Sequence, residues 1–74
     1  MEQEIFGRCM VDVSQLSDIS REDRMIYAEQ YAREKIITSR ALTTIIKEKL
    51  VVEPRYVFFG SDCIRVDFVI TSRC

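Results

Sequence analysis

The residue types that most often perform enzyme chemistry are scarce in this chain, which has three cysteines and no histidine. Without histidine it lacks the commonest general base and metal ligand, and neither a Ser-His nor a Cys-His nucleophile pair can form. Cys63 directly follows Asp62 at a predicted turn, where a neighbouring carboxylate disfavours the reactive, ionised form of the thiol. The sequence therefore predicts a protein that is not an enzyme and has no catalytic residues.

The cysteines also form a poor set of metal ligands. Cys9, Cys63 and Cys74 are far apart in the sequence, and no two of them form a C-x-x-C pair. A structural zinc site also needs four ligands, one more than these cysteines supply. Their odd number fits reduced thiols in an intracellular protein better than a disulfide framework. Gly7 and Gly60 are the only glycines, which excludes a glycine-rich phosphate loop. We expect neither a metal nor a cofactor.

Arginine and aromatic side chains offer one alternative chemistry. Arg8 and Arg65 alternate with apolar residues in two predicted strands, near Phe6 and Phe59, and such side chains stack unpaired bases in nucleic-acid-binding sheets. The net charge of -1 gives no broad basic surface, and two aspartates are predicted on the same sheet face. Single-stranded nucleic-acid binding through Arg8 and Arg65 is therefore the alternative function.

Residues 4–13 alternate with a period of two, which predicts a strand. Ser20 is placed to cap a helix, and apolar residues then recur at helical spacing from Met25 to Leu50. One helix of that length would reach about 45 Å, beyond the roughly 30 Å of a nine-residue strand. Either a single helix overhangs the sheet, or it breaks near residues 38–39 with Ser39 capping a second helix.

Residues 56–72 read as a hairpin with a turn at residues 60–62. A three-residue loop pairs Phe58 with Ile64 and Tyr56 with Val66, although a change of one residue in the loop would turn the first arm over. The second arm is the most apolar strand, which predicts a central position for it. The second arm is predicted to place one row of side chains in the core, namely Ile64, Val66, Phe68 and Ile70. The first strand is expected to contribute Ile5, Cys9, Val11 and Val13 to the same core.

These elements predict an α+β fold in which residues 1–74 form one domain. The order strand, helix, hairpin gives a three-stranded antiparallel sheet of order 1-3-2, with the long or broken helix packed on one face. The opposite face is predicted to carry Arg8, Arg65 and five large apolar residues. These five are Phe6, Met10, Val57, Phe59 and Val69.

An apolar sheet face on so small a domain favours a covered surface, because a core of this size supplies only about 3 to 5 kcal/mol. Ile26 and Ile37 lie eleven residues apart on the charged side of the helix and are predicted to form a second contact. The function expected is a protein-interaction module that binds an unidentified protein partner, forms a homodimer, or does both. Small accessory and inhibitor proteins, including phage-encoded ones, share this size and layout, although layout does not imply function.

Location is predicted from two absences. No stretch approaches the 18 apolar residues of a membrane span, and the acidic start MEQEIFG lacks the basic segment of a signal peptide. We expect a cytoplasmic protein without membrane contact.

Overall fold

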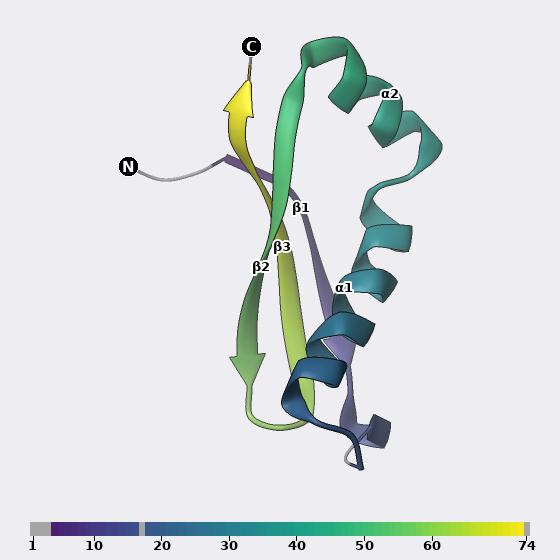
Figure 1. The fold of residues 1–74 in the computed structure, drawn as a ribbon, viewed down its shortest axis with the longest axis vertical. Coiled ribbons are helices and arrows are strands. Elements are labelled where there is room, and N and C mark those ends of the chain that lie inside the picture. Colours follow the sequence, from purple (N-terminus) through teal and green to yellow (C-terminus); the bar gives the residue numbers. More distant parts are fainter. Residues whose placement is uncertain (1–3, 17, 74) are drawn as a thin grey trace.

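A computed structural model describes residues 4–16 and 18–73 (Figure 1). The strands are β1 (Glu4–Asp12), β2 (Leu50–Phe59) and β3 (Cys63–Arg73), and the helices are η1 (Ser14–Leu16, 3-10), α1 (Arg21–Ile36) and α2 (Ser39–Glu48). All neighbouring strands are antiparallel, in the order β1-β3-β2. The α+β fold, the strand order and the helix on one face of the sheet are confirmed.

The core lies between α1 and the inner face of the sheet. Ala28 and Ala32, one helical turn apart, are fully buried, and these small side chains let α1 approach the strands closely. They meet the predicted core row of β3, whose members Ile64, Val66 and Phe68 are at most 2% exposed. Alternation along β3 therefore identified the buried side of the central strand correctly.

The hairpin has the predicted three-residue loop. Phe59 pairs with Cys63 on either side of residues 60–62, so Phe58 lies opposite Ile64 as expected. Gly60 has a φ of 66°, a left-handed conformation that glycine adopts without strain. The first arm is longer than predicted, because β2 begins at Leu50 and contains Pro54; proline is tolerated there because β2 is an edge strand.

The long helical segment is broken, which resolves the alternative left open by the sequence. Ser20 caps α1, accepting a 3.1 Å hydrogen bond from the Asp23 amide. The second cap is Thr38, whose hydroxyl accepts from the Ala41 amide at 3.3 Å. Ser39 is the first residue of α2, so the prediction that it is the cap was wrong by one position. After the break the chain turns, and α2 leads into β2 (Figure 1).

A β-bulge in β1 overturns part of the predicted face assignment. Ile5 pairs with Val69 and Gly7 pairs with Phe68, so Phe6 is an extra residue without a partner on β3. A bulge shifts the alternation by one residue, so the residues on its N-terminal side point to the opposite face from the one predicted. Phe6, predicted on the uncovered face, packs against the core instead, and Ile5, predicted in the core, is 44% exposed.

Candidate interaction surface

In the part of the chain that the structure describes, one face of the sheet has no helix on it (Figure 1). We call it the outer face, and define it by the residues that alternate with the core rows in the observed register. It comprises Ile5, Arg8, Met10, Asp12, Glu53, Arg55, Val57, Phe59, Cys63, Arg65, Asp67 and Val69.

Large apolar side chains gather at the hairpin end of this face. Met10 pairs with Arg65, which pairs in turn with Val57, and Phe59 lies in the next row. Met10 is 53% exposed and Phe59 47%, while Val57 is partly buried. We refer to Met10, Val57 and Phe59 as the hairpin-end cluster. All three were predicted as interface residues, and the structure places them together on the outer face.

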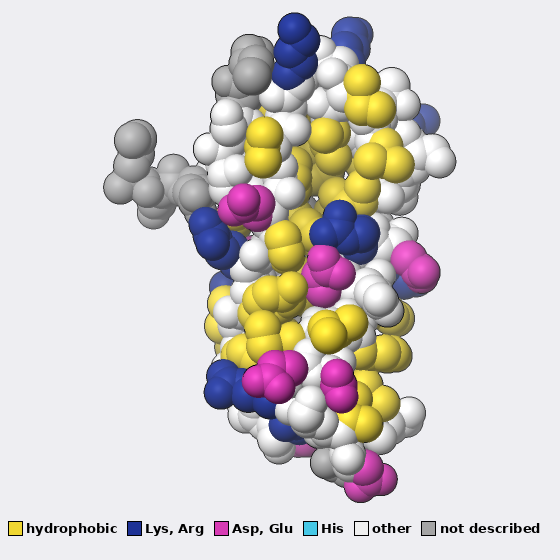
Figure 2. Space-filling model, in the orientation of Figure 1, with side chains coloured by type: hydrophobic (Ala, Val, Ile, Leu, Met, Phe, Trp, Pro, Cys, Tyr) yellow, Lys and Arg dark blue, Asp and Glu magenta, His cyan; other side chains and the backbone are white. Residues whose placement is uncertain are grey.

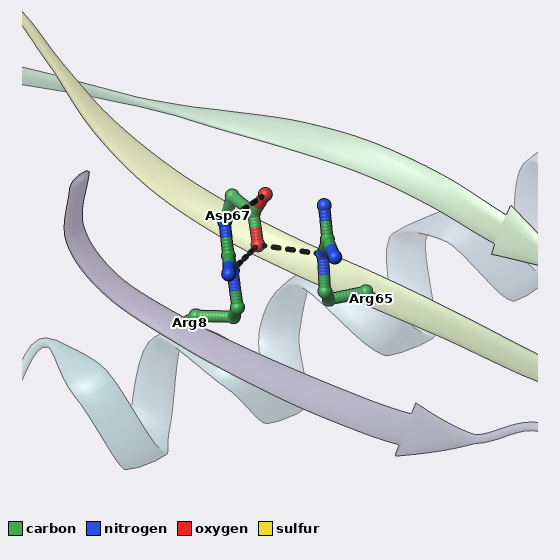
Figure 3. A network of polar contacts seen from close by, with 3 residues as sticks. All are labelled: Arg8, Arg65 and Asp67. Carbon is green, nitrogen blue, oxygen red and sulfur yellow. Dashed lines mark hydrogen bonds and ion pairs between the residues drawn. The ribbon is translucent and has the colours of Figure 1, made fainter. Parts of the chain in front are cut away.

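The middle of the outer face is a polar network around Asp67 (Figure 3). Arg8 donates from Nε to Asp67 Oδ1 at 2.8 Å and from Nη2 to Oδ2 at 3.4 Å. The Nε of Arg65 lies 3.1 Å from the same Oδ1 but is not aligned for a hydrogen bond, so this contact is an ion pair. Asp67 itself is only 6% exposed.

This network occupies both arginines that were candidates for nucleic-acid contact. The Arg8 and Arg65 side chains remain 48% and 27% exposed, but each places its Nε group against Asp67. The guanidinium of Arg65 also lies 5.8 Å from the ring centroid of Phe59. With Phe6 turned into the core, the predicted aromatic pair for base stacking is not present on one face.

Asp12 marks the corner of the outer face at the end of β1. The backbone N–H of Ser14 donates to Asp12 Oδ1 at 2.9 Å, and this bond, together with the Ser14 hydroxyl, lowers the pKa of the carboxyl group below its ordinary value. Asp12 is therefore negatively charged at neutral pH and adds an acidic edge beside the hairpin-end cluster.

The opposite end of the outer face differs from its prediction. Val69 was expected to be an interface residue, but it is only 5% exposed in the single chain and has little area left to lose. Its partner Ile5 is the exposed apolar residue there, which the sequence analysis missed. The available signal was Gly7, because a glycine inside a strand often marks a bulge.

The two residues predicted to form a second contact along the helix, Ile26 and Ile37, lie in different surroundings. Ile37 lies in the break between α1 and α2 and packs against the core, because the chain changes direction there. Ile26 is 55% exposed on α1. The two side chains therefore do not share one exposed line.

Instead, exposed apolar residues occur on α2, which the helical pattern had assigned to the core side. No residue of α2 is buried, and Leu42 and Ile46, one turn apart, are 46% and 74% exposed. The position of α2 explains this exposure, because α2 lies against the edge strand β2 while α1 packs on β1 and β3. Figure 2 shows hydrophobic side chains from the hairpin end up to the inner side of α2.

Within residues 4–16 and 18–73, no three cysteine, aspartate or glutamate residues gather into a cluster that could hold a metal ion. Cys9 and Cys63 are free thiols, as interpreted from their spacing, while Cys74 lies outside the described residues. No described helix combines the length and apolar character needed to cross a membrane.

Comparisons of the chain with protein-family models, with curated proteins and with solved structures gave no match.

Proposed function

We propose that this chain is a non-enzymatic interaction module that binds another protein, or a second copy of itself, through the outer face. One observation carries the proposal: within the described residues no helix covers the outer face (Figure 1), and Met10 and Phe59 of its hairpin-end cluster are each about half exposed. Large apolar side chains that a chain leaves exposed in a group mark an interaction surface. Such a protein acts as an accessory or inhibitory partner in the cytoplasm, where Cys9 and Cys63 stay reduced.

Contact through the face is favoured over contact through a sheet edge. Both edge strands are interrupted, β2 by Pro54 and β1 by the bulge at Phe6, and proteins use these two devices to prevent edge pairing. Removing roughly 50 to 100 Å² from water at each of three apolar side chains contributes several kcal/mol at about 25 cal/mol per Å². The entropic cost of association is of similar size, so a dimer made by the outer face alone is weak and a larger partner is favoured.

The nucleic-acid alternative has less support. Arg8 and Arg65 hold Asp67 between them, so a phosphate group would compete with a carboxylate that already binds both. Salt-sensitive binding of random single-stranded oligonucleotides at micromolar protein would favour this alternative, because phosphate contacts weaken steeply with ionic strength.

Sedimentation velocity over a range of concentrations tests self-association. We expect the wild type to form a concentration-dependent dimer and a Met10→Glu, Phe59→Glu variant to remain a folded monomer. Ile26→Glu is the control, since it places one such charge at a similarly exposed apolar position on α1, away from the outer face. A control that loses association together with the double variant would show that the outer face is not the contact.

Affinity purification from the native host with mass spectrometry tests binding to a foreign partner. A partner that is retained by the wild type and by Ile26→Glu, but lost with Met10→Glu, Phe59→Glu, supports the proposal. If the wild type stays monomeric at high micromolar concentration and retains no partner through these residues, the outer face is not an interaction surface.

A further inference from the structure

A cavity of about 180 Å³ lies on the other side of the hairpin end, between the first turn of α1 and the loop that follows β2. Its apolar lining comes from Val13, Phe58 and Ile64, of which Val13 and Ile64 are almost completely buried. Its polar lining includes two arginines, Arg21 and Arg24, and, among the described residues, no carboxylate. The site is therefore an apolar hollow with a cationic rim.

Both arginines are held at the cavity by contacts other than ion pairs. The guanidinium carbon of Arg21 lies 4.1 Å from the ring centroid of Phe58, in a cation–π arrangement. Arg24 donates from Nη1 to the carbonyl oxygen of Ser61 at 3.4 Å. Within the described part of the chain, neither guanidinium is paired with a carboxylate, unlike those of Arg8, Arg33 and Arg65.

The size of the cavity defines the apolar part of a ligand. An apolar cavity of about 150 Å³ accepts a molecule of benzene, so this one is large enough for one aromatic or branched aliphatic side chain. The charge of the rim defines the polar part, because guanidinium groups bind carboxylates through charge-assisted hydrogen bonds. A bulky apolar side chain next to a carboxylate satisfies both.

We propose that this cavity receives a bulky apolar side chain of a protein partner and that Arg21 and Arg24 bind an adjacent aspartate or glutamate of that partner. This proposal rests on the proposed function and specifies which side chains the protein partner must present. The location fits a shared interface, because Phe58 borders the cavity while the next residue, Phe59, belongs to the hairpin-end cluster. One partner that wraps around the hairpin end can contact both.

Titration of the ¹⁵N-labelled protein with short peptides tests the proposal directly. The first peptide is acetyl-Asp-Leu-Phe-Asp-amide. The second replaces both acids with asparagine, and the third replaces Leu-Phe with Ala-Ala. We expect the first peptide to cause saturable shifts of the amide signals of Gly60, Ser61 and Ile64, with at least fivefold weaker binding of the other two, because each loses one of the two kinds of contact.

Substitution of the two arginines at the rim of the cavity provides a second test. An Arg21→Gln, Arg24→Gln variant should bind the acidic peptide about fivefold more weakly, as expected for the loss of two partly exposed ion pairs. Arg40→Gln, Lys47→Gln removes the same net charge from α2 and should bind like the wild type. The same spectra report whether each variant is folded. Absent shifts at the cavity, equal shifts with all three peptides, or equal weakening in both variants would overturn the proposal.

These outcomes are independent of the outer face. If the outer-face variant loses its partner or its dimer while no peptide shifts the cavity signals, the proposed function stands and the cavity is not a site. If the acidic peptide binds at the cavity but the outer-face variant behaves like the wild type, the cavity is a site and the proposed outer-face contact is wrong.

Discussion

At the scale of single residues, the outer face is organised by Asp67. A carboxylate that is 6% exposed would be costly without partners, because burial removes it from water. Arg8 and Arg65 supply opposite charges from β1 and from β3 itself, so the network ties the edge strand to the central strand. The network therefore stabilises the sheet only when Asp67, Arg8 and Arg65 are all present. Loss of one group leaves the others without a partner for their charge.

Replacement of Asp67 by asparagine should therefore destabilise the fold by about 1 to 3 kcal/mol, because it leaves two neighbouring guanidinium groups without their shared anion. Urea unfolding at neutral pH measures the change. Glu34→Gln, which neutralises an exposed carboxylate on α1, is the control and should leave the midpoint unchanged. Equal midpoints for Asp67→Asn and the control would show that the network does not stabilise the sheet.

Gly7 fixes the distance between β1 and the end of α1. A Cβ atom at this position would overlap Cγ2 of Ile36 and would lie 3.3 Å from its Cγ1. Gly7→Ala should therefore cost about 1 to 3 kcal/mol through overpacking. Adding Ile36→Ala should recover part of that loss, since the two side chains compete for one space. Unfolding free energies that are simply additive would contradict this contact.

Tyr56, which packs against the core, should make the stability of the fold depend on pH. Its burial, aided by the nearby charge of Glu29 and opposed by Arg33, raises the pKa of the phenol above its ordinary value of 10.0. The folded chain thus holds this proton more tightly than the unfolded chain. The associated stability is complete below about pH 10 and is lost as the pH rises through the folded-state pKa.

The wild type should therefore lose stability relative to Tyr56→Phe as the pH is raised above about 10, with a constant difference between them from pH 7 to 9. Chemical unfolding of both proteins across this range measures it, and other titrating groups cancel in the difference. A difference that does not change with pH would contradict the raised pKa.

At the scale of elements, the break between the helices determines what is exposed. Thr38 ends the extended connection and caps α2, which lies against the edge strand β2. Leu42 and Ile46 are exposed for this reason, although their spacing is that of a core stripe. The amphipathic character of α2 is therefore available to a partner rather than used in the core.

Thr38→Ala should lower the stability by about 1 kcal/mol, because the Ala41 amide loses its capping partner. Ser39→Ala, which changes the residue expected from sequence to be the cap, should have a much smaller effect. Urea unfolding of the two variants compares neighbouring hydroxyl residues directly. The reverse order of effects would place the cap at Ser39.

At the scale of the whole molecule, the described residues form a two-layer arrangement in which helices cover one face of the sheet (Figure 1). The central strand β3 carries both environments, with Phe68 fully buried under α1 and Asp67 facing the other way. The two faces therefore tolerate different substitutions. The inner face carries most of the buried apolar side chains, whereas exposed positions of the outer face such as Phe59 should accept a polar side chain without loss of the fold.

A matched pair of substitutions tests this division. Phe68→Asp should unfold the chain, because an unpaired charge in the core costs several kcal/mol against a small total stability. Phe59→Asp should leave it folded, since Phe59 is 47% exposed on the outer face. Circular dichroism and sedimentation distinguish the outcomes. A folded Phe68→Asp protein would show that the core has been assigned to the wrong row.

The sequence by itself determined the type and order of the main elements, although it left the helix break open and assigned Leu50, the first residue of β2, to the helix. Alternation in β3, the Gly60 turn and the apolar spacing from Met25 to Leu50 are local patterns, and each follows from backbone geometry over a few residues. The short hairpin loop then fixed the register of β2 on β3, including Phe58 opposite Ile64. Val57 and Phe59 could be placed on one face for the same reason.

The tertiary structure alone decided which residues beyond the bulge are exposed. Alternation in residues 4–13 suits either face, and the exchange of Ile5 and Phe6 depends on pairing with β3 and on the approach of Ile36 to Gly7. The burial of Asp67 and Val69, and the apolar hollow beneath Arg21, likewise require segments far apart in the sequence. Such contacts leave no periodic signal, because they are set by the meeting of whole elements rather than by the geometry of one.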